Sequence, residues 1–174
     1  MNKKISVIIP VYNVECQHPG ALTALCECLE AQTYNSFEVL LIDDGSTDNS
    51  GEICDTIATQ DSRFKVFHTE NQGRCMARNF GLSKIEGDYV FFSDDDDLIH
   101  PQCFEMMVDL LEKHSDCDMV CGEKQMSNVP FMPISSPKYR IVDNDLMIKT
   151  MLHTNSVLNI FSKKKREVLY KGRK

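Results

Sequence analysis

The sequence predicts an α/β fold with a doubly wound, mainly parallel sheet and helices on both of its faces. From about residue 5 to residue 122, short apolar runs alternate with segments of helical period, as in successive βα units. Three of the apolar runs are continuous rather than alternating, which is typical of strands covered on both faces. The length of 174 residues favours one domain with a single core.

Five strands are predicted, and each is followed by polar or turn-forming residues. They are Ser6–Val11, Phe37–Ile42, Phe64–His68, Tyr89–Ser93 and Met119–Cys121. Helices are expected between them, because apolar side chains recur there at helical spacing. These segments are Leu22–Leu29, Ile53–Ile57 after a cap-like start at Asn49, and Phe104–Leu111 after a plausible first helical residue at Pro101.

The pattern changes after Gly122. Residues 128–139 contain three prolines and scattered apolar side chains, which predicts an extended loop. We expect a helix from about Asp143 to Leu152, and then a strand and a short helix within Ser156–Lys174.

The composition favours a soluble, cytosolic protein. No run approaches the roughly 18 apolar residues that a membrane-spanning helix requires, and the basic N-terminus leads into an apolar run too short for a signal peptide. The eight cysteines fall mostly inside apolar patterns and lack the spacing of a zinc site. We therefore expect free, buried thiols rather than disulfide bonds.

Charge is distributed unevenly along the chain. Seven of the 19 Lys and Arg residues, but only one of the 26 Asp and Glu residues, lie after residue 162, so residues 1–162 carry a net charge of −13. Such a body repels nucleic acid, which we exclude as a partner. The basic tail is compatible with peripheral contact to an anionic membrane, and equally with a solvated helix face or a linker.

Polar side chains gather where four of the predicted strands end. Ligands of doubly wound sheets bind outside the carboxyl ends of the strands, so these residues are the candidates for a binding site. In chain order they are Pro10, Tyr12, Asn13 and Glu15; Asp43 and Asp44; Arg74 and Arg78; and Asp94, Asp95, Asp96 and Asp97.

The run Asp94–Asp97 is the strongest chemical signal. Adjacent carboxylates repel one another unless a cation or hydrogen-bond donors compensate, and hard oxygen ligands suit Mg²⁺ or Mn²⁺. Such a cation keeps open positions for phosphate oxygens, which implies a diphosphate ligand. A solvated acidic loop is the competing interpretation.

The other candidates also have structural interpretations. Asp43 and Asp44 could accept hydrogen bonds from a nucleobase or ribose, or belong to a turn at Gly45 that leads into a capped helix. Arg78 and Arg74 could neutralise phosphate charge or form ordinary surface ion pairs. Tyr12 could lie beside a base while the backbone of Pro10–Asn13 reads the edge of that base, or Tyr12 could fill the rim of the core and Asn13 form a turn.

Several motifs together resemble family 2 glycosyltransferases. The resemblance covers about residues 4–123, in the family's order and approximate spacing, with weaker likeness at Asn159–Lys163. The motifs are Ser6–Asn13, Gln32–Tyr34, Phe37–Asp48, Asn71–Gly73, Ala77–Leu82 and Gly87–Val90.

The resemblance implies a GT-A, Rossmann-like fold and an inverting glycosyltransferase. The donor would be a nucleotide-diphosphate sugar, most simply a UDP-sugar, and the acceptor a saccharide or lipid-linked hydroxyl in cell-surface polysaccharide synthesis. Asp94–Asp96 would match the family's Asp-x-Asp element, with Asp94 and Asp96 as ligands of Mg²⁺ or Mn²⁺. The nucleotide would contact Pro10, Tyr12, Asn13, Glu15, Asp43, Asp44, Arg74, Arg78, Asp94 and Asp95.

Two departures from the family pattern qualify this interpretation. Residues Cys16–Gly20 lengthen the loop after the first strand by about four residues. The acidic element that supplies the family's catalytic base has no match, since Asp143 and Asp145 precede Asn159–Lys163 and favour opening a helix. We therefore expect a donor-binding core in residues 1–123, a partial acceptor-side region in residues 124–174, and a base C-terminal to a truncated chain.

Two other function classes stay open. If the base is absent from the whole protein, the chain would be a non-catalytic nucleotide-sugar-binding module. A nucleotidyltransferase or phosphotransfer domain with an aspartate cluster is the third interpretation, although the sequence has neither a Gly-rich phosphate loop nor a matching lysine motif. Turnover of the donor separates the first two classes, and a nucleotide-binding screen separates both from the third.

Overall fold

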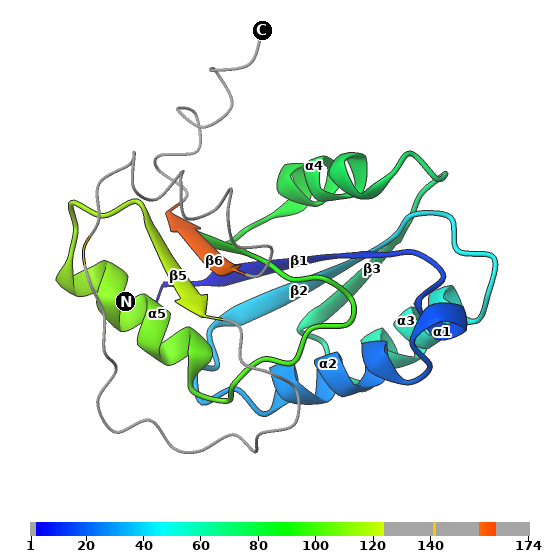
Figure 1. The fold of residues 1–174 in the computed structure, drawn as a ribbon, viewed down its shortest axis with the longest axis horizontal. Coiled ribbons are helices and arrows are strands. Elements are labelled where there is room, and N and C mark those ends of the chain that lie inside the picture. Colours follow the sequence, from blue (N-terminus) through cyan, green and yellow to red (C-terminus); the bar gives the residue numbers. More distant parts are fainter. Residues whose placement is uncertain (1–2, 124–140, 142–156, 163–174) are drawn as a thin grey trace, which may run out of the picture.

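A computed structural model describes residues 3–123, residue 141 and residues 157–162 (Figure 1). Within these residues a six-stranded sheet has the order β3-β2-β1-β4-β6-β5. Its strands are β1 (Ile5–Val11), β2 (Phe37–Asp43), β3 (Phe64–His68), β4 (Tyr89–Phe92), β5 (Met119–Glu123) and β6 (Val157–Ser162). The five predicted strands are all present, at nearly the predicted bounds.

The sheet is mainly parallel, as predicted. β1 pairs in parallel with β2 and β4, and β2 pairs in parallel with β3. β6 lies between β4 and β5 and is antiparallel to both. The strand expected within Ser156–Lys174 is thus confirmed. The loop expected at residues 128–139, the helix at Asp143–Leu152 and the short helix after the last strand lie outside the described residues.

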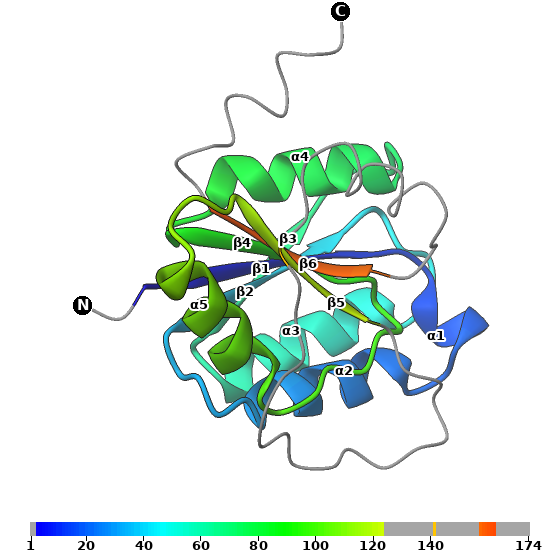
Figure 2. The same ribbon diagram turned by 60° about the vertical axis from the view of Figure 1, so that its left-hand side comes forward.

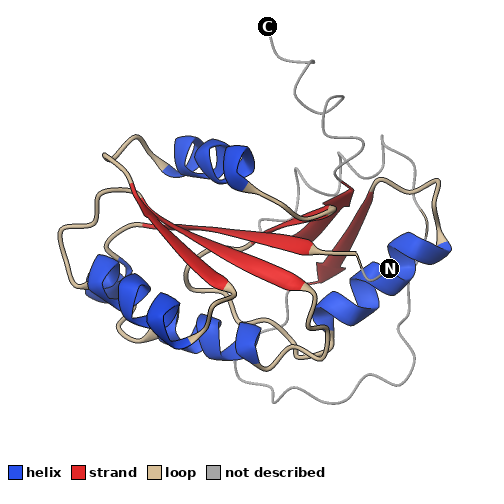
Figure 3. Ribbon diagram, turned by 180° about the vertical axis from the view of Figure 1, so that it is seen from behind, coloured by secondary structure: helices blue, strands red, loops and turns tan. Residues whose placement is uncertain are grey.

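Helices cover both faces of the sheet, as the doubly wound prediction requires (Figures 1 and 2). They are α1 (Val14–Gln17), α2 (Ala21–Glu30), α3 (Ser50–Gln60), α4 (Arg74–Lys84) and α5 (Cys103–Lys113). Helix α4 lies on one face, and α2, α3 and α5 lie on the other (Figure 3). The predicted fold class is confirmed.

Two helix starts differ from the sequence prediction in detail. Asn49 occupies the N-cap position of α3 as predicted, but its side chain makes no capping hydrogen bond. Asp48 Oδ1 instead accepts a hydrogen bond from the Ser50 N–H at 2.9 Å. Pro101 lies before α5 rather than in its first turn, since the helix begins at Cys103.

The core is split by the sheet into two layers. On the face of α2, α3 and α5, the fully buried ring of Phe104 packs edge-on against Phe37 and Phe91, with ring centroids 5.5 and 5.1 Å apart. On the other face, α4 packs against β1 at Gly81, where an added Cβ would lie 2.6 Å from Ile8 Cγ2. Glycine at this position therefore allows the helix to lie close to the sheet.

The cysteines are free thiols, but they are not uniformly buried. Cys26 and Cys54 lie in the core, whereas Cys16 and Cys75 are exposed. Burial raises the pKa of Cys26 to about 12, so this thiol stays protonated at neutral pH. The expectation of buried thiols therefore holds for only part of the set.

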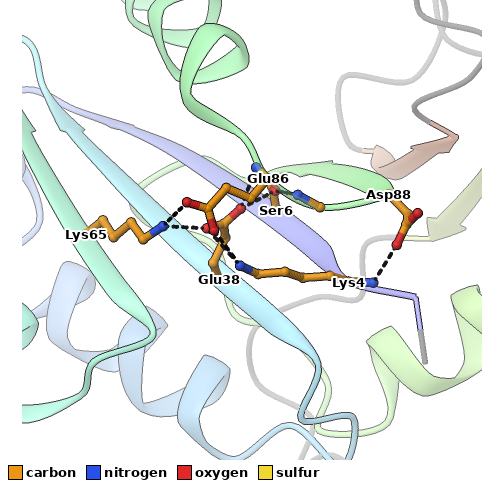
Figure 4. Close-up of polar contacts among 7 residues, drawn as sticks. Lys4, Ser6, Glu38, Lys65, Glu86 and Asp88 are labelled. Carbon is orange, nitrogen blue, oxygen red and sulfur yellow. Dashed lines mark hydrogen bonds and ion pairs between the residues drawn. The ribbon is translucent and has the colours of Figure 1, made fainter. Parts of the chain in front are cut away.

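A buried carboxylate fastens the amino-terminal ends of the strands (Figure 4). Glu38, in β2, accepts hydrogen bonds from Ser6 Oγ at 2.6 Å and from the Glu86 N–H at 2.8 Å. Lys4 and Lys65 lie 3.2 and 2.9 Å from its other oxygen, and both also contact Glu86. The cluster joins three strands to the turn that precedes β4, and so fixes where β4 enters the sheet.

The Glu38 cluster predicts an acid-sensitive contribution to stability. Burial opposes ionisation of Glu38, but the hydrogen bonds from Ser6, Lys65 and the backbone outweigh it and lower its pKa to about 2. Because the pKa is lowered on folding, the stabilisation is present above about pH 5 and is lost as the pH falls toward 2. Glu38→Gln should therefore reduce the free energy of unfolding by about 2–3 kcal/mol at pH 7.

Urea denaturation of the wild type and Glu38→Gln at pH 7, 5 and 3 tests this. The difference between the two proteins should shrink steadily toward pH 3. Asp109→Asn serves as the matched control, since Asp109 forms an exposed ion pair with Lys113 and its loss should change stability by less than about 0.5 kcal/mol. A Glu38→Gln effect as small as that of Asp109→Asn would contradict the prediction.

Candidate functional site

The carboxyl ends of β1, β2 and β4 meet at one edge of the sheet. Val11 at the end of β1 pairs with Asp43, whereas the last pair between β1 and β4 is Ile8 with Phe92. The segment after β4 therefore passes beside the final residues of β1. The Tyr12 N–H makes a long 3.5 Å contact with Asp95 Oδ2, so the aspartate run reaches the end of β1.

At the end of β1, the predicted site residues differ in exposure. Pro10 is a buried residue of β1, and it lies after Ile8, the last residue of β1 that pairs with β4. Tyr12 is 44% exposed, so its side chain is not buried in the hydrophobic core. Asn13 adopts a left-handed conformation with φ 51°, which asparagine tolerates better than most residues.

The Asn13 side chain fastens this strand end to the loop after β2. Its Oδ1 atom accepts hydrogen bonds from the Thr47 N–H at 2.7 Å and from the Asp48 N–H at 3.3 Å. The Asn13 N–H in turn donates to Ser46 Oγ at 3.1 Å. Asn13 therefore has a structural role at the edge of the site, the interpretation that the sequence left open beside nucleotide contact.

Asp43 and Asp44 are both buried and are both held by the protein. Asp43 accepts hydrogen bonds from the Ser46 N–H at 3.0 Å and from His68 Nδ1 at 2.8 Å. Asp44 accepts from the backbone N–H groups of Gln72 and Gly73 at 2.9 and 2.8 Å. These carboxylates join the end of β2 to the segments that follow β2 and β3, and their contact with a nucleotide stays a prediction.

Gly45 makes the predicted turn after β2. Its φ of +71° is a conformation that glycine adopts readily, and a Cβ there would lie 2.9 Å from the Asn71 backbone nitrogen. The loops after β2 and β3 are therefore in close contact at this point.

His68 is a site-adjacent residue that the sequence reasoning did not single out. Its hydrogen bonds to Asp43 and then Asp55 raise its pKa above the ordinary value for histidine. The available signal was its place as the last residue of a predicted strand.

The four consecutive aspartates point to four different neighbours. Asp97 is buried and turns back, so that its Oδ2 accepts a hydrogen bond from the Asp94 N–H at 3.0 Å. Asp94 Oδ1 pairs with Arg78 Nη2 at 2.5 Å. Asp95 reaches Tyr12, and Asp96 lies on the surface 3.9 Å from His18 Nε2. The run is therefore an ordered turn with distinct roles, not a uniform solvated loop.

Negative charge is concentrated in this turn. Burial raises the pKa of Asp95, the hydrogen bond from the Tyr12 N–H opposes the shift, and the nearby charges of Asp96 and Asp94 add to it. No cluster of three or more His, Cys, Asp or Glu side chains within the described ranges is arranged to hold a metal by itself. Any cation here would need ligands from elsewhere, and phosphate oxygens commonly supply them.

Arg78 and Arg74 lie on α4, in its second and first turns. Arg74 is exposed, whereas Arg78 is partly buried and ion-paired with Asp94. Two buried side-chain polar atoms lack a hydrogen-bond partner among residues 3–123, and they are Arg78 Nε and Glu15 Oε1. Both belong to predicted nucleotide-binding residues, one a donor and the other an acceptor.

Comparison with known proteins assigns the family. Residues 6–165 match the family described as glycosyl transferase family 2. The chain belongs to glycosyl transferase family 2. It is similar to the glycosyltransferase GlyG of Streptococcus pneumoniae, with 40% identity over 126 residues, or 70% of this chain and 39% of GlyG. An uncharacterised glycosyltransferase of Haemophilus influenzae is 47% identical over 113 residues, or 63% of this chain and 43% of that protein.

Solved structures agree with this family assignment. Residues 1–349 of S. aureus TarS superpose with a TM-score of 0.73 and 28% identity, covering 91% of this chain and 47% of that one. The same TarS fragment has been solved in complex with UDP and with UDP-GlcNAc. The mannosyltransferase PcManGT of Pyrobaculum calidifontis, in complex with GDP-Man and Mn²⁺, shares the fold at a TM-score of 0.67 and 19% identity. The GT-A fold expected from the resemblance is confirmed.

The chain spans less than half the length of these relatives, between 39% and 47%. Across the helices described in residues 3–123, none is both long and apolar enough to cross a membrane.

Asn13→Ala should loosen the edge of the site. It removes the acceptor of the Thr47 and Asp48 N–H groups and places alanine at a φ of 51°, so we expect a loss of about 1–3 kcal/mol of unfolding free energy. Hydrogen exchange should rise at residues 46–50 in particular. Asn35→Ala, at an exposed position, is the control. Unchanged exchange at residues 46–50 would show that Asn13 does not hold this loop.

Proposed function

We propose that the protein binds a nucleoside diphosphate sugar at the carboxyl edge of β1, β2 and β4, and that it transfers the sugar with inversion to an acceptor hydroxyl. The single observation that carries the proposal is the meeting of Tyr12, Arg78 and the Asp94–Asp96 turn at this edge, where the buried Nε atom of Arg78 has no hydrogen-bond partner. Unpartnered buried groups are rare and require an explanation, and a bound ligand provides one. UDP is the favoured nucleotide, because TarS is solved with UDP and UDP-GlcNAc.

The unpartnered atoms suit the polar groups of such a donor. Arg78 Nε is an N–H donor of the same guanidinium that Asp94 holds through Nη2, an arrangement suited to phosphate. Glu15 Oε1 is an acceptor suited to a ribose hydroxyl or a base N–H, while its other oxygen is held by the Gly20 N–H at 3.0 Å. Tyr12, exposed at the end of β1, offers a ring face beside the base.

The aspartate turn fits a divalent cation of the Mg²⁺ or Mn²⁺ type. Mg²⁺ is usually held by one or two carboxylates together with phosphate oxygens, so the absence of a three-ligand cluster among the described residues does not argue against it. Asp96 and Asp94 are the proposed ligands. The cation would stabilise the negative charge that develops on the departing nucleoside diphosphate.

The chain's own residues would orient the donor. Arg78 would neutralise diphosphate charge, and Asp94 would keep the guanidinium aimed, through its 2.5 Å ion pair. Asp43 and Asp44 would act mainly by fixing the loops that surround the nucleotide, since their carboxylates already accept two hydrogen bonds each. Acceptor identity, a role in cell-surface polysaccharide synthesis and membrane contact stay predictions from the sequence.

A non-catalytic nucleotide-sugar-binding module is the second candidate. Binding alone cannot separate the two candidates, because both require the same donor site. Release of UDP from UDP-GlcNAc in the presence of saccharide acceptors supports the enzyme, whereas binding without turnover supports the module.

Asp96→Ala should abolish metal-dependent nucleotide binding. Calorimetric titration of UDP in the presence of Mn²⁺ should show a loss of at least about tenfold in affinity, because the cation loses a carboxylate ligand. The matched control is Asp109→Ala, an exposed aspartate on α5 that forms a surface pair with Lys113. Equal UDP affinity in Asp96→Ala and the wild type would refute the assignment of Asp96, and no binding of UDP, GDP or dTDP with any divalent cation would refute the donor site.

A further inference from the structure

The loop that lengthens the connection after β1 brings a histidine to the aspartate turn. His18 Nε2 lies 3.9 Å from Asp96 Oδ2, although the two residues are 78 positions apart in the chain. Both side chains are partly exposed, at 60% and 44%, so neither is placed there by core packing. The contact joins the segment that departs from the family pattern to the proposed metal ligand.

The backbone around His18 is ordered by hydrogen bonds on both sides. The His18 N–H donates to Val14 O at 2.7 Å and ends α1, and its carbonyl accepts the Ala21 N–H at 3.0 Å as α2 begins. The Gly20 N–H donates to Glu15 Oε2 at 3.0 Å. These bonds hold the histidine backbone between two helices, with the side chain at Asp96.

The same segment is also fastened to the loop after β2. The Cys16 N–H donates to Asp48 Oδ2 at 2.9 Å, and the Glu15 N–H donates to Ser50 Oγ at 3.2 Å. The Asn13 side chain bonds to the same loop. The position of His18 relative to the sheet is thus set by several anchored residues, as a preorganised ligand requires.

The two side chains are close enough to reach one cation. Adjacent ligand atoms about 2.1 Å from an octahedral ion lie roughly 3 Å apart. The 3.9 Å between Nε2 and Oδ2 is longer than this, and rotation of the two exposed side chains would bring the atoms to that spacing. An imidazole nitrogen suits transition-metal ions, whereas Mg²⁺ prefers oxygen ligands.

We propose that His18 is an additional ligand of the divalent cation that binds with the nucleoside diphosphate, and that it biases the site toward a transition-metal ion over Mg²⁺. The proposal rests on the donor site proposed above, since phosphate oxygens complete the ligand set. Asp96 supplies the neighbouring oxygen. His18 is then a positioning residue for the cation and takes no part in proton transfer.

Pulsed EPR on the wild-type protein with Mn²⁺ and UDP gives the direct test. A nitrogen ligand produces ¹⁴N modulation of the Mn²⁺ signal, which we expect in the wild type and in Gln17→Ala, and which should disappear in His18→Ala. Gln17 is the matched control because it is exposed and adjacent in the same segment. Absence of ¹⁴N modulation in a wild-type sample that binds Mn²⁺ and UDP would overturn the proposal while leaving the donor site intact.

Metal selectivity gives the second readout. Calorimetric titration of UDP at constant pH should show that His18→Ala loses about tenfold in affinity with Mn²⁺ or Co²⁺ and less than about twofold with Mg²⁺. His18→Asp, which replaces the nitrogen with an oxygen, should recover Mg²⁺ binding at least to the wild-type level while the preference for Co²⁺ is lost.

The remaining outcomes are also decisive. An equal loss with all three metals would mean that His18 contacts the nucleotide instead, and would overturn the proposal. A wild-type protein that binds UDP with no dependence on a cation would overturn both the role of His18 and the metal part of the proposed function. Thermal unfolding of each variant, expected to be unchanged for these exposed positions, confirms that the comparison is between folded proteins.

Discussion

The parallel pairing of β1 with β2 and β4 is the constraint on which the site depends. Because these strands run in the same direction, their carboxyl ends fall at one edge, and residues that are more than 80 positions apart become neighbours. The contact between Tyr12 and Asp95 and the pair of Arg78 with Asp94 both follow from that arrangement. A sheet with β4 reversed relative to β1 would separate the aspartate turn from the end of β1.

The two edges of the sheet divide structural and functional tasks. At the amino-terminal edge, both carboxylate oxygens of Glu38 have partners within the protein, namely Ser6, Lys4 and Lys65 (Figure 4). The charge of Glu38 therefore stabilises the contacts between strands. At the carboxyl edge, Glu15 and Arg78 each keep a buried atom without a partner. Incomplete pairing of this kind reduces stability, and it is expected where a ligand completes the hydrogen bonds.

The sequence was sufficient for the strands and their direction, because continuous apolar runs and helical periodicity are local signals. It was insufficient for the place of β6 between β4 and β5, since strand order depends on long-range pairing. For the site, too, local features could be predicted and long-range contacts could not. Strand-end polar residues were identifiable, but their partners were not, because the contact between His18 and Asp96 joins distant segments. Glu38 was overlooked as one charge inside an apolar strand, although Lys65 in the neighbouring strand was a usable signal.

The position of β6 has a consequence for folding during synthesis. β6 is the last described strand in the chain, yet it is an interior strand that separates β4 from β5. Until Val157–Ser162 leaves the ribosome, the β4 backbone has an open hydrogen-bonding edge where another chain could add. Nascent chains that stall between β5 and β6 should therefore be the form most dependent on chaperones.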